Sequence, residues 1–263
     1  MDTFSPEIAP KIVAHRGNAP GFAENTAAAF ENALAMPIHG VECDVRFSRD
    51  GVVMVQHDAT VDRTSDGTGR LADLTAAQLR SLNVGTTSLP QRMMTLEELL
   101  EMVLAAGDRH LYLEIKSPAL RNQRLEEEVV RCLTRHALQE DPRIHVISFS
   151  HSAMRRIARL APRLDRWYLR RDRELDHNPG DLLFSRPRGL GLSIEAARRS
   201  PRLVDARGLP TYLWTVNDRA GMKFAESLGV DVLATDRPDV ALELFFPEAP
   251  VLAKENAGEP GKL

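Results

Sequence analysis

Short apolar runs alternate with amphipathic segments along most of this chain. The apolar runs predict strands at 11–14, 40–47, 52–56, 110–115, 144–148, 165–169, 191–194, 211–216 and 231–235. All but 52–56 are separated by stretches with a helical pattern, and some of these begin with a capping box, as at Thr75 to Gln78 and Thr95 to Glu98. Eight strands in β-α alternation favour a closed (β/α)₈ TIM barrel over an open sheet.

The run 52–56 is the exception to this alternation. Only Ser48 to Gly51 separate it from the strand before it, which is too short for a helical crossover and predicts an antiparallel hairpin. We therefore expect a small hairpin and helical insertion over about 51–92, after the second strand. The chain shows no internal repeat, so we predict one domain over 1–246 and a flexible tail over 247–263, where Pro, Gly, Glu and Lys are frequent.

Composition narrows the class of protein. The 263 residues, 43% of them hydrophobic, can bury a full core. A net charge of −3 argues against a nucleic-acid or membrane-surface role, since both need a cationic face. Cys43 and Cys132 are too few for a disulfide framework, and the N-terminus has no secretory pattern. We expect a cytoplasmic protein with no stable membrane association, and the sequence leaves its oligomeric state open.

Acidic and histidine residues gather at the ends of the predicted strands. Glu42 and Asp44 stand two residues apart and project from one face of the second strand, and Glu114 lies near the end of the next barrel strand. His15 and His57 each follow an apolar run. Because the carboxyl ends of barrel strands meet at one rim, we expect these side chains to converge on a metal-assisted site.

The residue types indicate the chemistry of that site. Three carboxylates favour a hard divalent cation, Mg²⁺ or Ca²⁺, over zinc, and Mn²⁺ is compatible with the same ligands. Arg16 and Lys116 beside the acids indicate an anionic substrate, although Lys116 alone could simply pair with Glu114 or Asp44. Two histidines can form an acid–base pair near neutrality, whereas either one alone is more often structural.

Other polar features receive structural interpretations. Arginines between 155 and 173 predict a solvated helix face and loop. Four histidines have no recurring charged neighbours in the sequence and stay unassigned: His110, His136, His145 and His177.

Several ordered motifs resemble the glycerophosphodiester phosphodiesterase family, over about 12–239. The matching motifs are His15-Arg-Gly, Glu24-Asn-Thr, Glu42-Cys-Asp-Val-Arg-Phe, His57-Asp, Arg63-Thr-Ser-Asp-Gly-Thr-Gly, Leu113-Glu-Ile-Lys, Trp214-Thr-Val-Asn and Thr235-Asp-Arg-Pro. The resemblance implies metal-dependent hydrolysis of glycerophosphodiesters to glycerol 3-phosphate and an alcohol.

The resemblance also implies roles for individual residues. Glu42, Asp44 and Glu114 would hold the metal, His15 and His57 would be the general acid and base, Arg16 and Lys116 would bind phosphate, and Trp214 would line the glycerol or leaving group. The sequence does not decide which histidine is acid or base, or whether a cyclic phosphate precedes attack by water. A lysophospholipase D-like enzyme and a barrel that only binds a phosphodiester remain alternatives.

Overall fold

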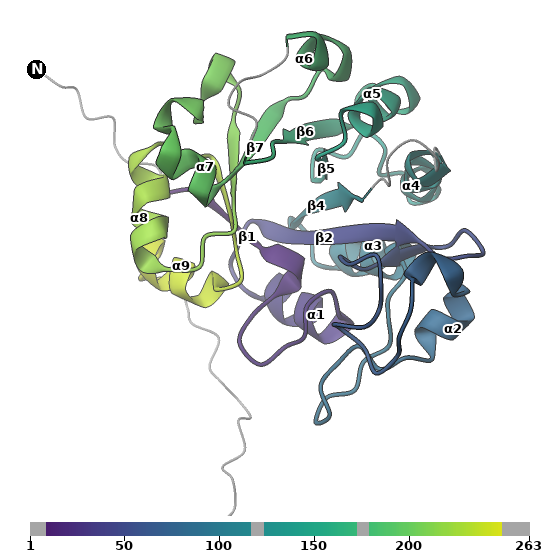
Figure 1. The fold of residues 1–263 in the computed structure, drawn as a ribbon. Coiled ribbons are helices and arrows are strands. Elements are labelled where there is room, and N and C mark those ends of the chain that lie inside the picture. Colours follow the sequence, from purple (N-terminus) through teal and green to yellow (C-terminus); the bar gives the residue numbers. More distant parts are fainter. Residues whose placement is uncertain (1–8, 117–123, 173–178, 249–263) are drawn as a thin grey trace, which may run out of the picture.

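Eight parallel strands close into a barrel in the structure, a computed structural model that describes residues 9–116, 124–172 and 179–248 (Figure 1). The barrel strands are β1 (Lys11–Ala14), β2 (Gly40–Phe47), β4 (His110–Ile115), β5 (Ile144–Ser148), β6 (Asp165–Leu169), β7 (Gly189–Ser193), β8 (Thr211–Trp214) and β9 (Val232–Thr235). They follow one another in this order, and β1 pairs with both β9 and β2, which closes the sheet. The predicted TIM barrel is confirmed.

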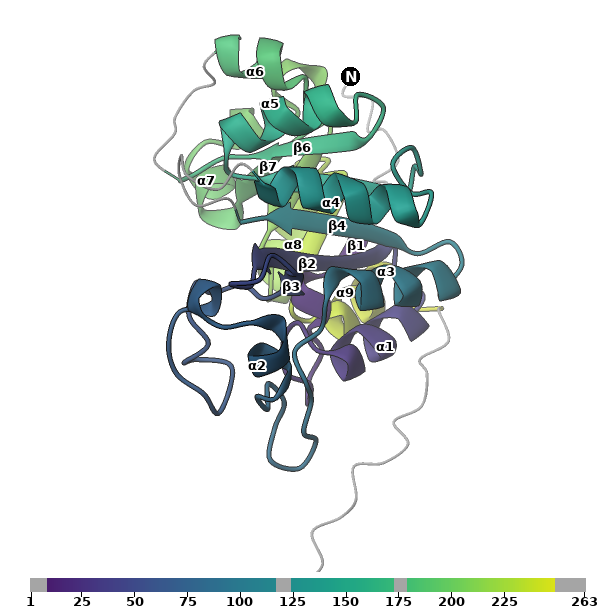
Figure 2. The same ribbon diagram turned by 90° about the vertical axis from the view of Figure 1, so that its right-hand side faces the viewer.

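Helices cover the outside of the barrel, as the packing of α3 and α4 beside β2 and β4 shows (Figure 2). They are α1 (Ala27–Ala35), α3 (Leu96–Ala105), α4 (Arg124–Arg135), α5 (His151–Leu160), α6 (Pro179–Ser185), α7 (Ile194–Arg199), α8 (Arg219–Ser227) and α9 (Pro238–Phe245). The insertion after β2 carries α2 (Ala76–Arg80) and the 3₁₀ turn η2 (Leu71–Asp73), and three further 3₁₀ turns are η1 (His15–Gly17), η3 (Pro201–Leu203) and η4 (Ala206–Gly208). Thr75 and Thr95 form the reciprocal capping boxes that the sequence predicts.

The two faces of β2 show how the barrel divides its side chains. Cys43 and its neighbours Val41 and Val45 are fully buried in the layer between strands and helices. Glu42 and Asp44 alternate with them and belong to the opposite face. In register with Glu42, Tyr112 of β4 belongs to a separate interior cluster of aromatic and aliphatic side chains. This cluster fills the barrel beneath the acidic residues.

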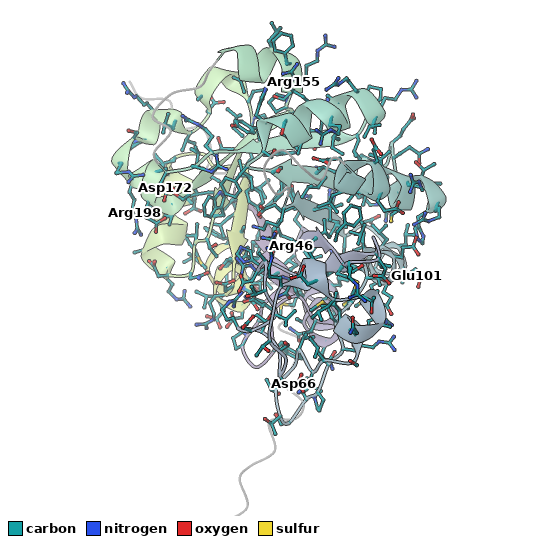
Figure 3. The ribbon with its side chains drawn as sticks, turned by 45° about the vertical axis from the view of Figure 1, so that its right-hand side comes forward. Arg46, Asp66, Glu101, Arg155, Asp172 and Arg198 are labelled. Atoms are coloured by element: carbon teal, nitrogen blue, oxygen red, sulfur yellow. The ribbon has the colours of Figure 1, made fainter. Side chains whose placement is uncertain are left out.

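The insertion after β2 is a hairpin with a core of its own. Strand β3 (Val53–Val55) runs antiparallel to the end of β2, and Val45 lies opposite Val55. Six side chains of the region form a separate buried cluster: Met54, Val61, Leu71, Leu79, Val84 and Met93. Asp66 lies at the far end of the insertion, well away from Arg46 near the end of β2 (Figure 3). The predicted hairpin is therefore confirmed.

Some sequence-based expectations were wrong or lie outside the described residues. The seventh barrel strand spans 189–193 rather than 191–194, because Ser193 caps α7 and Ile194 already belongs to the helix. Arg166 is only 4% exposed, and its guanidinium donates to the backbone oxygens of Leu164 and Arg186 at 2.6 and 3.2 Å. It is not part of a solvated face. Most of the predicted tail, from 249 onward, lies outside the described residues, as does His177.

Candidate active site

Three buried carboxylates meet at the carboxyl ends of β2 and β4. Glu42, Asp44 and Glu114 are 2%, 1% and 7% exposed, and their ligand oxygens lie within 4.8 Å of one another. The parallel register places Asp44 directly opposite Glu114, so both side chains leave the sheet on the same side. The structure therefore brings together the three acids that the sequence singles out.

Two positively charged side chains, those of Lys116 and Arg16, contact this acidic group. The Lys116 ammonium lies 3.0 Å from Asp44 Oδ1 and 2.8 Å from Glu114 Oε1, while Arg16 Nε lies 3.3 Å from Asp44 Oδ2. The sequence could not decide whether Lys116 pairs with Asp44 or Glu114, and the structure shows that it contacts both. Lys116 and Arg16 both lie against Asp44, and neither forms an ion pair with Glu42 among the described contacts.

The pKa values of the acids reflect this imbalance of charge. Burial, with the nearby charges of Asp44 and Glu114, raises the pKa of Glu42 well above its usual value. Burial likewise raises the pKa of Glu114 to about 7, against the opposing effect of Lys116. Burial would also raise the pKa of Asp44, but Lys116 and Arg16 lower it below its usual value. The donor set is thus hard, crowded and short of positive charge, which fits a divalent cation.

An unusual backbone at Arg16 adds a donor to the site. Arg16 adopts φ 56° and ψ 26°, in the left-handed region that non-glycine residues rarely occupy. Its backbone N–H donates to Glu42 Oε2 at 2.9 Å. The next residue, Gly17, also has a positive φ of 66°, and a Cβ there would lie 2.7 Å from the Phe30 ring. The His-Arg-Gly motif therefore needs glycine at its third position.

His15 is held by a carboxylate that sequence reasoning did not single out. Its Nδ1 lies 2.8 Å from Asp236 Oδ1, and its Nε2 lies 3.9 Å from Glu42 Oε2. Asp236, immediately after β9, also accepts from Asn18 Nδ2 at 2.9 Å and Asn217 Nδ2 at 2.7 Å. A carboxylate on Nδ1 favours the tautomer that leaves Nε2 free to face the acids.

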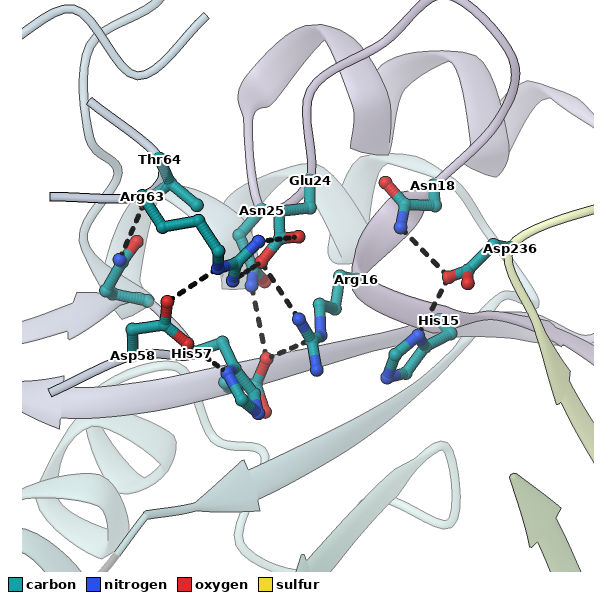
Figure 4. A network of polar contacts seen from close by, with 12 residues as sticks. His15, Arg16, Asn18, Glu24, Asn25, His57, Asp58, Arg63, Thr64 and Asp236 are labelled. Carbon is teal, nitrogen blue, oxygen red and sulfur yellow. Dashed lines mark hydrogen bonds and ion pairs between the residues drawn. The ribbon is translucent and has the colours of Figure 1, made fainter. Parts of the chain in front are cut away.

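His57 has a matching arrangement two residues beyond β3. Its Nδ1 lies 2.6 Å from Asp58 Oδ1, and Arg63 bridges Asp58 and Glu24 with hydrogen bonds of 2.6 to 2.8 Å. Glu24 in turn accepts from Arg16 Nη1 at 2.9 Å, so one network joins the insertion to η1, directly after β1 (Figure 4). Burial lowers the pKa of His57 below its usual value.

The sequence indicated the three acids by their spacing, but it did not indicate which residues hold the two histidines and Arg16 in place. Glu24, Asp58, Arg63, Asn217 and Asp236 all lie within or beside motifs quoted for the resemblance, but no local spacing indicated their contacts. Figure 4 shows His15 and His57 on either side of Arg16.

An aromatic pair and a cleft adjoin the site. Trp214, at the end of β8, packs edge-on against Phe149 with ring centroids 5.3 Å apart, and Lys116 Nζ lies 6.0 Å from the Phe149 ring. A cleft of about 460 Å³ runs past Glu114 and Lys116, with Arg46 in its lining. A larger cavity of about 900 Å³ lies between the insertion and α3, and its lining includes none of Glu42, Asp44, Glu114, His15 and His57.

No helix within the described ranges combines the length and the apolar character needed to cross a membrane.

Similarity to known proteins identifies the class of enzyme to which this barrel belongs, the phosphoric diester hydrolases. A sequence model of the family described as "Glycerophosphoryl diester phosphodiesterase family" matches residues 15–240. The chain belongs to this family. It is 33% identical over 251 residues to the "Probable glycerophosphodiester phosphodiesterase 1" of Mycobacterium tuberculosis, covering 87% of this chain and 90% of that protein.

Two further comparisons agree. A glycerophosphodiester phosphodiesterase of Bacillus altitudinis is 30% identical over 246 residues, which cover 89% of this chain and 97% of that protein. Among solved structures, a phosphodiesterase of Oleispira antarctica in complex with the product sn-glycerol-3-phosphate matches with a TM-score of 0.81 and 25% identity, covering 90% of this chain and 96% of that one. The predicted family and enzyme class are confirmed.

Proposed function

We propose that this protein hydrolyses glycerophosphodiesters to glycerol 3-phosphate and an alcohol, with one divalent cation and two histidines acting as general acid and base. The observation that carries the proposal is the meeting of three buried carboxylates with two carboxylate-backed imidazoles at one rim. The product bound to the Oleispira protein supports the same substrate class.

Glu42, Asp44 and Glu114 would hold the cation, and oxygen ligands favour Mg²⁺ or Ca²⁺, with Mn²⁺ also compatible. A bound divalent cation would lower the pKa of an attacking hydroxyl or water and offset negative charge that develops on the phosphoryl group. The Arg16 amide, which donates to Glu42, holds one carboxylate in place for this task. The shortage of positive charge around the acids supports a cation at this point.

The histidines would move protons at their Nε2 atoms. Asp236 and Asp58 each bind an Nδ1, which keeps the ring orientation fixed and leaves Nε2 toward the substrate. One histidine would accept the proton of the attacking hydroxyl or water, and the other would give a proton to the departing alkoxide. The two come from separate parts of the chain, so they can approach the phosphorus from different sides.

Arg16 and Lys116 would contact the phosphate. Both are largely buried beside the acids, at 16% and 14% side-chain exposure, so their charges act in a weakly screened environment. Trp214 and Phe149 would form the apolar wall beside the glycerol or the leaving group.

Turnover of glycerophosphocholine with and without EDTA tests the proposal. We expect activity to fall to background after chelation and to return when Mg²⁺, Mn²⁺ or Ca²⁺ is added separately. Phosphorus NMR identifies the product, and lysophosphatidylcholine in parallel tests the lipid-directed alternative. Full activity in EDTA would remove the cation from the proposal.

Single replacements test the two histidines. His15→Ala and His57→Ala should each lower kcat about 10²–10⁴-fold if the imidazoles act as acid and base. His136→Ala, which changes a histidine just after α4, is the matched control. Unchanged turnover in either of the first two variants would contradict the proposed role.

A further inference from the structure

Two histidines that the sequence leaves unassigned, His110 and His145, meet His39 at the other end of the barrel. His39 immediately precedes β2, His110 is the first residue of β4 and His145 is the second residue of β5. One ligand nitrogen from each lies within 4.8 Å of the others. Because the strands are parallel, this cluster lies at their amino-terminal ends, whereas Glu42, Asp44 and Glu114 lie toward the carboxyl ends. The two groups are therefore separate.

The rings are packed closely together. His110 Nδ1 lies 2.8 Å from His145 Nε2, and the His39 ring stacks on the His110 ring with centroids 3.8 Å apart. The backbone of His110 also donates to the His39 oxygen at 3.0 Å. Gly40 permits this approach, because a Cβ at that position would lie 2.1 Å from the His110 carbonyl oxygen.

A carboxylate orients one ring of the cluster. Asp165, the first residue of β6, binds His145 Nδ1 and also accepts from Trp167 Nε1 at 2.8 Å. With its Nδ1–H directed at Asp165, His145 presents the lone pair of Nε2 to the other two histidines. Tyr112 stacks on the far side of this ring, with centroids 4.3 Å apart. A histidine held in this way by a carboxylate matches the outer-shell pattern of protein metal sites.

The charge state of the cluster suits a metal at neutral pH. Burial, and then the charge of neighbouring histidines, lowers the pKa of His39 to about 3 and of His110 to about 4. Both are therefore neutral imidazoles, and only the hydrogen that His110 Nδ1 shares with His145 Nε2 has to be given up when these nitrogens bind an ion. The charged groups nearby are of both signs: Lys11, Arg109 and Arg143 against Asp141 and Asp165.

We propose that His39, His110 and His145 form a second metal site, which binds Zn²⁺, or a similar divalent ion such as Cu²⁺ or Ni²⁺, through imidazole nitrogens. Imidazole suits Zn²⁺, Cu²⁺ and Ni²⁺, whereas the all-carboxylate group at the opposite rim suits Mg²⁺ and Ca²⁺. Nitrogens at about 2.0–2.1 Å from a tetrahedral ion lie roughly 3.3 Å apart. A pair at the 4.8 Å limit would have to approach by about 1.5 Å, and His110 Nδ1 and His145 Nε2, which lie 2.8 Å apart, would have to separate by about 0.5 Å.

The strands that carry the ligands indicate what the ion does. His39, His110, His145 and Asp165 belong to β2, β4, β5 and β6 or their edges, four neighbours in the barrel. An ion bound here would tie the starts of three strands together, with the fourth held through Asp165. We infer a structural role for this ion. The histidine site does not depend on the proposed hydrolysis of glycerophosphodiesters, so evidence against one proposal is not evidence against the other.

Zinc titration by calorimetry, on full-length protein freed of metal and supplied with excess Mg²⁺, tests the proposal. The wild type should bind one more equivalent of Zn²⁺ than His110→Asn or His39→Gln, and His136→Asn should bind as much as the wild type. His39→Gln should keep its Mg²⁺-supported turnover, since His39 takes no part in the catalytic site. Equal Zn²⁺ stoichiometry in all four proteins would overturn the proposal.

A thermal melt supplies a second readout that does not depend on activity. Zn²⁺ at a hundredfold excess over its Kd should raise the wild-type Tm by about 5–10 °C. The shift should disappear in His39→Gln and persist in Glu42→Gln. The reverse pattern, loss in Glu42→Gln alone, would assign the zinc to the acidic site and refute the histidine site.

Discussion

Replacing Asp236 with asparagine tests whether a carboxylate behind His15 is needed for catalysis. Three donors converge on the Asp236 side chain: His15 Nδ1 and Asn18 Nδ2 on one oxygen, and Asn217 Nδ2 on the other. Burial would raise the pKa of Asp236, but the hydrogen bonds, with that from His15 foremost, lower it to about 2. The group is therefore a full carboxylate at neutral pH. An asparagine at this position has only one oxygen to accept from the three donors. Its own N–H₂ group would face the donors that the oxygen does not reach.

The size of the effect follows from these contacts. A hydrogen bond to a charged group contributes about 1.5–3 kcal/mol, but Asp236 is 34% exposed, so solvent reduces its effect on folding to about 1 kcal/mol. The effect on rate should be larger, because the His15 ring loses its fixed tautomer as well as its orientation. Complete loss of an acid–base group costs about 10²–10⁴-fold, which sets the upper limit, and we expect about 10²-fold in kcat with little change in KM.

Steady-state kinetics on Asp236→Asn, His15→Ala and the double variant provide the assay. Because Asp236 acts through His15, its replacement should have no further effect once His15 is alanine. Asp239→Asn, which loses an exposed ion pair with Arg237 nearby, is the control and should retain its activity. Asp236→Glu should recover part of the rate. A kcat within about threefold of wild type, or additive losses in the double variant, would refute a positioning role.

Three further replacements are expected to act as follows. The Glu98 carboxylate accepts two hydrogen bonds from Arg80, at 2.6 and 2.8 Å, and they lower the pKa of Glu98 to about 2. This pair therefore stabilises the folded protein above pH 4.5, the pKa of Glu98 in the unfolded chain, and the stabilisation is lost as the pH falls toward 2. Glu98→Gln should therefore lower the free energy of unfolding in urea by about 1–2 kcal/mol at pH 7, with the difference gone near pH 2. Gly40→Ala places a Cβ 2.1 Å from the His110 carbonyl oxygen and should destabilise the barrel by about 2–3 kcal/mol in the same assay; an unchanged unfolding midpoint would contradict this close approach. Lys116→Met leaves buried carboxylates uncompensated, so its Tm should fall in EDTA by more than in saturating Mg²⁺, and equal losses in both would argue against a cation at the acids.

The sequence was most informative where structure is local. Apolar runs located every barrel strand, and the two-residue spacing of Glu42 and Asp44 placed both on one face of β2. The short turn after Phe47 was enough to predict the hairpin of β3, because no helix fits into four residues. These features depend on period and length alone, so one chain suffices to read them.

Contacts between distant segments were not available from such patterns. His15 and Asp236 are 221 positions apart, and only closure of the barrel between β1 and β9 brings them together. His39, His110 and His145 likewise meet because their strands are neighbours in space, although no spacing along the chain links them. Arg166 was misread because its arginine-rich surroundings conceal that it reaches inward to backbone carbonyls.

The antiparallel pairing of β3 with the end of β2 determines how the proposed catalytic groups could be separated from one another. One strand carries Glu42 and Asp44, and its antiparallel neighbour leads directly to His57, whereas His15 arrives on β1. The hairpin has a hydrophobic cluster of its own, so a protease cut within it could free the His57 arm without opening the barrel. On the proposed mechanism, such a nicked protein would still bind a cation at its acidic rim but would lose its turnover.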